Sequence, residues 1–483
     1  MRQNSLWRRS DAPDCAPISA AILNNRGQGR ASGLCPGAAN RRVRPSNGGS
    51  RTRQNGVYWC SMLHPKRSCG QDGAHDTTFF DVHCHAINLG HPNILALLAR
   101  RDHERGGLGE LLFGPYTAFL LRRPGYKFRN LLSVMENDTG AIFRLMEDDL
   151  RGEFGRGADQ PLVRNGILRI ADRSYHRAVL TPLIIDFGVK EMEPLRTYYN
   201  RAPSKPIADQ VIEMVEGLKR YYGERPDGFF EIYPFLGINP ANYDLQTLGQ
   251  ILDTYFARYL PVRRLFRRVH RKTGQLAVKL STITSFTFLG IKLYPPLGFD
   301  PWPAEGAARQ KVEHLYRFCQ LKRIPITTHC SDAGFTAVAR ARSREMTSPL
   351  RWRSVLHRYP ELRINFAHFG RQYHRRWGLL TDHSWRRALV ELMRVYPDVY
   401  SDIAFNATRV RFYRRLSAFL AALSGPLRER VASRLLFGSD FPLSLIDAQS
   451  YAEYVGQLGK APLDPWIRHA LCCRNPARFL FGE

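Results

Sequence analysis

Long apolar runs are missing from this sequence. The longest candidate, residues 178–187, is interrupted by a proline and falls well short of the ~18 apolar residues that a membrane-spanning helix requires. The first residues also lack the apolar region of roughly 7 to 15 residues that marks a secretory signal. We therefore predict no membrane span and no membrane partner, and we interpret 178–187 as a buried strand.

Cysteine pairs with the spacing C-x-x-C are also absent. Four of the nine cysteines fall within the first 75 residues, and the other five form no even framework along the rest of the chain. Reduced thiols and a cytoplasmic location are therefore the simplest expectation.

Acidic residues are scarce relative to basic ones. The chain has 71 Lys and Arg against 43 Asp and Glu, a net charge of +28, and such an excess suits nucleic acid, an anionic membrane or an acidic substrate. Residues 1–75 alone carry 12 basic and three acidic residues, and they show almost no periodic apolar pattern. We therefore predict a disordered, Arg-rich tail at 1–75. An organelle transit peptide, or an upstream-extended start with Met62 as the alternative start, would also account for it.

The remainder, residues 76–483, alternates strand-like and helix-like segments, and hydrophobic residues make up 44% of the chain. The predicted strands are 78–85, 178–187, 229–238, 288–294, 324–330, 362–369, 399–405 and 435–441. The predicted helices are 93–101, 207–222, 248–269 with a kink or split at Pro261, 304–322, 348–359, 383–396, 411–433 and 462–481. Eight βα units predict an α/β protein with a parallel sheet, namely a (β/α)₈ TIM barrel with a partly helical insertion at about 106–177.

The first predicted strand ends in two histidines two residues apart, His83 and His85. Side chains at this spacing leave a strand on the same face, so the two imidazoles can converge on one point. Neutral imidazole is a common ligand of zinc and similar ions. For an isolated pair of this kind, structural packing is the alternative interpretation.

Four later strands also end in ionisable residues or residues that can bind a metal: Lys292, His329, His368 and Asp440. The carboxyl ends of the strands carry the chemistry of such a barrel. Five strands of eight ending this way, in a chain with 15 histidines, indicate one shared site.

The residues that carry a family resemblance are His83, His85, His329, His368 and Asp440, together with segments 290–296, 367–370, 436–442 and 475–480. The first five resemble the ligand pattern of the amidohydrolase superfamily of metal-dependent barrel enzymes. The four segments are similar to the amidohydrolase-related clade that includes aminocarboxymuconate semialdehyde decarboxylase. The resemblance covers roughly 78–482, without the insertion and the long segment before residue 288.

The resemblance implies a set of ligands for one divalent metal ion, namely His83, His85, His329 and Asp440. Zn²⁺ is the expected ion, and Mn²⁺ and Fe²⁺ are the alternatives. A catalytic zinc keeps an open position for water and lowers the pKa of that water from about 15.7 to about 7. Asp440 would take the proton as the water attacks, and His368 would polarise the substrate or shuttle a proton.

Lys292 bears on the number of ions. Binuclear members of the superfamily use a bridging lysine on strand four, and Lys292 shares a strand face with Gly290 and Tyr294 that can point into the barrel. The sequence Lys-Leu-Tyr-Pro-Pro resembles the mononuclear clade instead, which implies one ion and an unmodified Lys292. Its cation would orient an anionic substrate or a nearby carboxylate. Asp81, of the same strand parity as the two histidines, is expected to hold a neighbour in place.

The predicted function is a metal-dependent hydrolase that attacks an amide, lactone or ester of a small, anionic substrate. A metal-dependent decarboxylase of an aromatic or unsaturated acid would use the same ligands. A basic nucleic-acid-binding protein on a retired barrel is disfavoured, because every ligand position is intact. The sequence leaves open whether the chain forms a homo-oligomer.

Overall fold

The computed structural model describes residues 77–88, 90, 126–154, 161–187, 207–273, 285–334, 336, 338–373, 375–376, 380–381 and 383–483. All of them lie in the compact unit Gly70–Glu483. The predicted tail at 1–75, the predicted helix at 93–101 and the first part of the predicted insertion lie outside the described residues. Within these ranges no helix combines the length and the apolar character needed to cross a bilayer.

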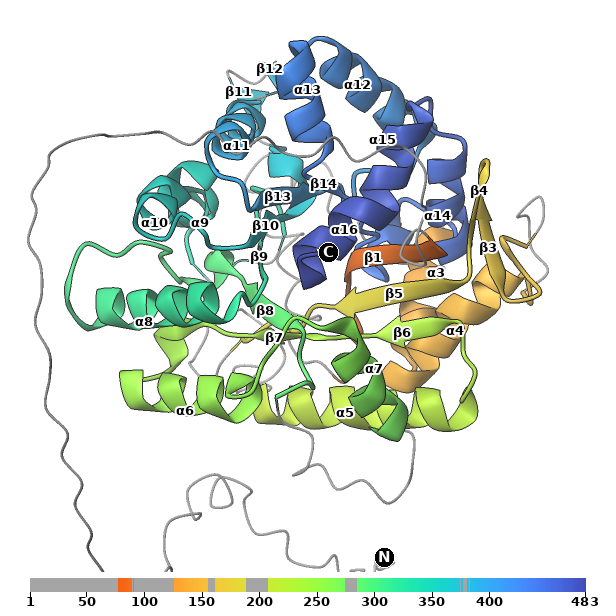
Figure 1. The fold of residues 1–483 in the computed structure, drawn as a ribbon, viewed down its shortest axis with the longest axis horizontal. Coiled ribbons are helices and arrows are strands. Elements are labelled where there is room, and N and C mark those ends of the chain that lie inside the picture. Colours follow the sequence, from red (N-terminus) through yellow and green to blue (C-terminus); the bar gives the residue numbers. More distant parts are fainter. Residues whose placement is uncertain are drawn as a thin grey trace, which may run out of the picture. The chain divides into compact units, whose positions relative to one another are not determined.

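Two parallel sheets form the centre of this unit, and helices lie around them (Figure 1). The first sheet has the order β1 (Thr78–Cys84), β5 (Arg177–Pro182), β6 (Phe230–Ile232). The second has the order β14 (Leu435–Leu436), β13 (Val399–Asp402), β10 (Ile364–Phe366), β9 (Ile326–Thr328), β8 (Gly290–Leu293), β7 (Phe235–Gly237). Every pair of neighbours in both sheets is parallel. The predicted α/β class with parallel strands is therefore confirmed.

Backbone hydrogen bonds join the first sheet to both ends of the second sheet, near β14 and at β7. The Val82 N–H of β1 donates to the carbonyl oxygen of Phe437, just after β14, at 3.0 Å. Beyond β5, the Ile184 N–H donates to the carbonyl oxygen of Phe235 in β7 at 3.1 Å. The predicted strand 229–238 appears as β6 and β7, because Pro234 lies between them and proline has no N–H to donate to a sheet.

Most predicted helices are present, in some cases as two shorter helices. They are α5 (Ile207–Glu224), α6 (Leu245–Phe256), α7 (Arg263–Thr273), α8 (Gly306–Lys322), α10 (Arg353–Arg358), α11 (Ser384–Val395), α12 (Val410–Ala421), α13 (Gly425–Ala432), α15 (Pro465–His469) and α16 (Asn475–Phe481). The predicted helix 248–269 is split before Pro261, whose ring is incompatible with a helix interior. Two further helices, α9 (Arg340–Thr347) and α14 (Tyr451–Gly459), were not predicted.

Helix packing follows the apolar periodicity of the sequence. In α5, Val211, Val215 and Leu218 recur at helical spacing and are all buried. In α8 the buried stripe includes Val312, Leu315 and Cys319. These stripes are therefore part of the buried core of the unit.

The described part of the predicted insertion contains α3 (Tyr126–Met135) and α4 (Thr139–Arg151), so its helical character is confirmed. A small antiparallel sheet of β2 (Val163–Arg164), β3 (Ile167–Ile170) and β4 (Arg173–Tyr175) was not predicted. Its first turn is Asn165-Gly166, with φ of 51° and 71°. This dipeptide is a strong hairpin signal, so the sequence did contain the evidence for it.

Candidate metal centre

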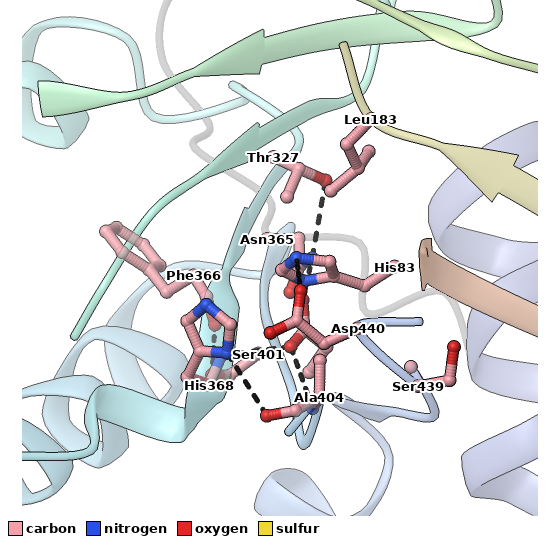
Figure 2. Close-up of polar contacts among 12 residues, drawn as sticks. His83, Leu183, Thr327, Asn365, Phe366, His368, Ser401, Ala404, Ser439 and Asp440 are labelled. Atoms are coloured by element: carbon pink, nitrogen blue, oxygen red, sulfur yellow. Dashed lines mark hydrogen bonds and ion pairs between the residues drawn. The ribbon is translucent and has the colours of Figure 1, made fainter. Parts of the chain in front are cut away.

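The predicted site residues lie where parallel strands end. His83 is in β1 and His85 directly follows it, and both are almost fully buried. Lys292 is in β8, while His329, His368 and Asp440 follow β9, β10 and β14. Figure 2 shows His83, His368 and Asp440 directed toward the same space from three separate elements. The common parallel direction of the strands therefore brings residues from across the chain together.

Three of the four predicted ligands converge. The Nε2 atom of His83 lies 3.3 Å from Oδ1 of Asp440, and Nε2 of His85 lies 3.2 Å from the same oxygen. Four ligands placed about 2.05 Å from a tetrahedral ion are about 3.3 Å apart. These donor atoms thus have the chemistry and the spacing of a metal centre.

The two histidines present the same nitrogen to this point. Nδ1 of His85 lies 2.8 Å from the Leu183 carbonyl oxygen, which can only accept, so Nδ1 carries the proton. Nδ1 of His83 lies 2.9 Å from Oδ2 of Asp402, again an acceptor. In the neutral rings both Nε2 atoms therefore direct a lone pair at the Asp440 carboxylate. Three bases facing one another fit a cation between them, and such Nδ1 partners are typical of histidines that bind metals.

The charges around this point agree with that assignment. Burial raises the pKa of Asp440, but the His83 and His85 imidazoles outweigh burial and hold that pKa well below its usual value. Burial lowers the pKa of His85 and prevails over the nearby carboxylate. Burial also acts to lower the pKa of His83, but the Asp402 carboxylate outweighs it and the pKa is raised. His83 thus lies between the Asp402 and Asp440 carboxylates, which favour a positive charge at this point.

The backbone at Asp440 is adapted to its position. Its φ is 59°, in the left-handed region, and its N–H donates to the His83 carbonyl oxygen at 2.6 Å. Two residues earlier, a Cβ atom on Gly438 would lie 2.7 Å from Cβ of His83, so only glycine permits this approach. Backbone of this kind in non-glycine residues is concentrated at functional sites.

His368 also has left-handed backbone, with φ of 64°. Its carbonyl oxygen accepts from Nδ2 of Asn406 at 2.7 Å, and its Nδ1 lies 3.1 Å from the Ala404 carbonyl oxygen and so donates to it. Burial lowers the pKa of His368 to about 4. At neutral pH its Nε2 therefore carries a free lone pair, in a ring whose centroid is 4.9 Å from that of His83.

His329, the fourth predicted ligand, is not part of the converging group. Its Nε2 donates to the Ala333 carbonyl oxygen at 2.9 Å, and its ring centroid lies 4.9 Å from that of His368. Burial holds the pKa of His329 well below its ordinary value, so the ring is neutral. Its remaining lone pair is on Nδ1.

Lys292 is 1% exposed, and its Nζ has no hydrogen-bond partner among the described residues. Burial lowers its pKa to about 8, against the attraction of Asp402 and Asp440. The ammonium group is thus close enough to both carboxylates to feel their charge, yet is bonded to neither.

Asp402 was not predicted as a site residue. It ends β13, within the predicted strand 399–405, and the rule that identified Lys292 and Asp440 would have identified it too. Asp81, in contrast, was predicted to hold a neighbouring residue in place, and its contacts agree with this role. Its carboxylate accepts from the N–H groups of His83 and Ser439 and from the Tyr451 hydroxyl, and burial raises its pKa to about 6.

The family model described as amidohydrolase, Amidohydro_2, matches residues 276–482. Lys292, His329, His368 and Asp440 lie inside this region, so the resemblance predicted from the motifs is confirmed. No curated protein matches the sequence.

Several solved structures resemble the chain. An amidohydrolase II is 12% identical over 83% of this chain and 99% of its own, with a TM-score of 0.39. A probable 2-pyrone-4,6-dicarboxylic acid hydrolase from Acinetobacter baumannii is 10% identical over 84% and 99%, with a TM-score of 0.40. A 4-oxalomesaconate hydratase from Rhodopseudomonas palustris is 11% identical over 83% and 95%, with a TM-score of 0.37. These TM-scores are low, and the likenesses carry no argument about activity.

Proposed function

We propose that this chain, an enzyme of the amidohydrolase family by its match over 276–482, is a metal-dependent hydrolase of an amide, lactone or ester. The observation that carries the proposal is the convergence of Nε2 of His83, Nε2 of His85 and Oδ1 of Asp440. We further propose that the two sheets form one closed (β/α)₈ barrel, which the hydrogen bonds from the first sheet to both ends of the second sheet support.

His83, His85 and Asp440 would hold one divalent ion, with His329 as the proposed fourth ligand. A set of imidazole nitrogens and one carboxylate suits Zn²⁺, and also accepts Mn²⁺ or Fe²⁺. When bound, such an ion supplies Lewis acidity and lowers the pKa of adjacent water.

Asp440 and His368 have the proton states that hydrolysis requires. The Asp440 carboxylate is ionised and accepts the proton that water loses as its oxygen bonds to the acyl carbon. The neutral His368 has its Nδ1 proton engaged by Ala404, so Nε2 can accept a proton and return it to the leaving nitrogen or oxygen. Of the two roles predicted for His368, this geometry supports the proton shuttle over polarisation of the substrate.

Lys292 indicates an anionic substrate. A buried ammonium group without a hydrogen-bond partner is costly, and an anionic group of the substrate would offset that cost. We propose that Lys292 is unmodified and binds such a group. The same contact would suit a carboxylate that is about to leave as carbon dioxide, so a decarboxylase is the second candidate function.

The decisive experiment is a substrate screen with the metal-loaded protein. Amides, lactones and esters of small acids are tested with a pH indicator, and aromatic and unsaturated acids with a carbon dioxide assay. We expect hydrolysis without carbon dioxide, lost in Asp440→Ala and kept in the control Asp447→Ala, which changes an exposed carboxylate on the following turn. Carbon dioxide release would establish the decarboxylase instead.

We also propose a reducing compartment such as the cytoplasm. Cys84, Cys319, Cys330 and Cys472 are buried and form no disulfide within the described part of the chain. A mass spectrum of the protein, denatured in the presence of an alkylating reagent, tests this point, and we expect these thiols to be reduced.

A further inference from the structure

We propose that Asp402 is a positioning residue that fixes the tautomer of His83 and the backbone of His368 together, and so links metal affinity to proton transfer. The inference rests on the proposed function. It concerns a residue at the end of β13 whose carboxylate contacts Nδ1 of His83, whereas Nε2 of the same ring faces Asp440.

The Asp402 carboxylate is fully buried and accepts four hydrogen bonds. Oδ2 accepts from Nδ1 of His83 at 2.9 Å and from Nδ2 of Asn365 at 2.7 Å. Oδ1 accepts from the backbone N–H groups of His368 at 2.9 Å and Ala404 at 3.1 Å. Figure 2 shows Asn365, His83 and His368 in the same region of the site.

These four contacts fix the proton on His83. A backbone N–H and an amide N–H can only donate, so both oxygens of Asp402 are engaged as acceptors. Nδ1 of His83 must then be the donor to Oδ2, and its Nε2 is left with the lone pair that a metal requires. The tautomer of His83 is thus set by a residue 319 positions away in the sequence.

The same carboxylate holds His368 in its unusual backbone conformation. The His368 N–H donates to Oδ1, while its carbonyl oxygen is held by Asn406. Left-handed backbone is unfavourable for a residue with a side chain, so it persists only where such contacts fix it. One carboxylate therefore orients a proposed metal ligand and the proposed proton shuttle.

Asp402→Asn separates this role from a general structural one, because the new amide has nearly the same shape. Its single oxygen is required by the two backbone N–H groups of His368 and Ala404. Its NH₂ group then faces Nδ1 of His83, which must become the acceptor and move its proton to Nε2. Oδ1 of Asn365 has no hydrogen-bond partner in the described part of the chain, so that amide can turn and accept from the new NH₂.

The test measures the dissociation constant for Zn²⁺ by competition with a chromophoric chelator. Loss of a carboxylate behind a metal-binding histidine typically costs 10- to 100-fold in affinity, and we expect about this loss for Asp402→Asn. The matched control is Asn365→Ala, which removes the other side-chain donor to Oδ2 and leaves the His83 tautomer unchanged. It should alter affinity by less than about threefold, a change too small for a lost metal ligand or its partner.

A second measurement tests the proposal in the wild type, so it stands even if the variant does not fold. Selective ¹⁵N labelling of histidine in the metal-free wild type reports which ring nitrogen of His83 carries the proton, at a pH where the ring is neutral, with His83→Gln to assign the signal. We expect the proton on Nδ1 in the wild type and on Nε2 in Asp402→Asn.

The outcomes are distinct. A wild type that binds no divalent ion contradicts the proposed function. A wild type that binds Zn²⁺, with equal affinity in Asp402→Asn or with the His83 proton already on Nε2, overturns the positioning role and leaves the hydrolase proposal intact. Equal losses in Asp402→Asn and Asn365→Ala would assign the effect to packing between β10 and β13 and also overturn the positioning role.

Discussion

Replacement of Lys292 by methionine should make the metal-free protein more stable. Burial lowers the pKa of Lys292 from 10.5 to about 8. At about 1.36 kcal/mol per pKa unit, the buried ammonium group costs about 3 kcal/mol at neutral pH. Methionine has a similar length and no charge, so Lys292→Met removes this cost. For a unit of the size of Gly70–Glu483, the gain corresponds to a rise of about 3 °C in Tm.

The stability difference between Lys292→Met and the wild type should change with pH in a defined direction. Because the pKa of Lys292 is lower in the folded state, the unfolded state binds more protons between pH 8 and 10.5, and stability rises with pH there. The cost is complete below about pH 8 and disappears as the pH approaches 10.5. The advantage of Lys292→Met over the wild type should therefore shrink across this window.

The assay is urea unfolding at pH 7 and pH 10 with a chelator present, and Lys460→Met, which removes an exposed lysine, is the control. The same Lys292→Met protein should bind an anionic substrate poorly. Such a gain in stability with a loss of function is expected where a strained polar group serves a site. A variant less stable than the wild type at pH 7, or an advantage that does not change with pH, would refute the reasoning.

Three further predictions concern the tail, the ion count and the proton shuttle. A chain that starts near residue 75 should keep the Tm of the full chain, because 1–75 offers little apolar surface to offset chain ordering; a clear fall in Tm on truncation would contradict this. Lys292→Ala should keep about one equivalent of metal by elemental analysis, whereas loss of one of two equivalents would restore a bridging lysine. Burial lowers the pKa of His368 to about 4, so hydrolysis should decline only as the pH falls toward 4 and His368 takes up a proton. His368→Gln should remove that acid limb from the pH profile, and an unchanged limb would assign it to another group.

The strands and their parallel order could be predicted from the sequence, because βα periodicity reflects burial along the chain. Their ends could not. Residues 435–441 were predicted as strand, but β14 stops at Leu436 and the chain turns to place Asp440 with positive φ. Residues 362–369 likewise end as a strand at Phe366, because His368 is left-handed. Strand propensity contains no information on such local strain, and at both positions the departure occurs at a site residue.

The sequence predicted which residues form the site better than it predicted the contacts between them. His83, His85 and Asp440 converge because the carboxyl ends of parallel strands meet, which the sequence pattern indicates. The pairing of His83 with Asp402 depends on which strands become neighbours in space, and it escaped prediction. The contact of His329 with Ala333 depends on the conformation of a loop, which periodicity does not report.

The metal content of the purified chain tests the central claim most directly. Elemental analysis of the wild type, His83→Ala, Asp440→Ala and the control Asp447→Ala measures whether the converging atoms hold an ion. We expect about one equivalent of a divalent metal in the wild type and the control, and almost none in the other two. Folded His83→Ala and Asp440→Ala proteins that keep a full equivalent, or a wild type that neither contains nor takes up an ion, would contradict the account.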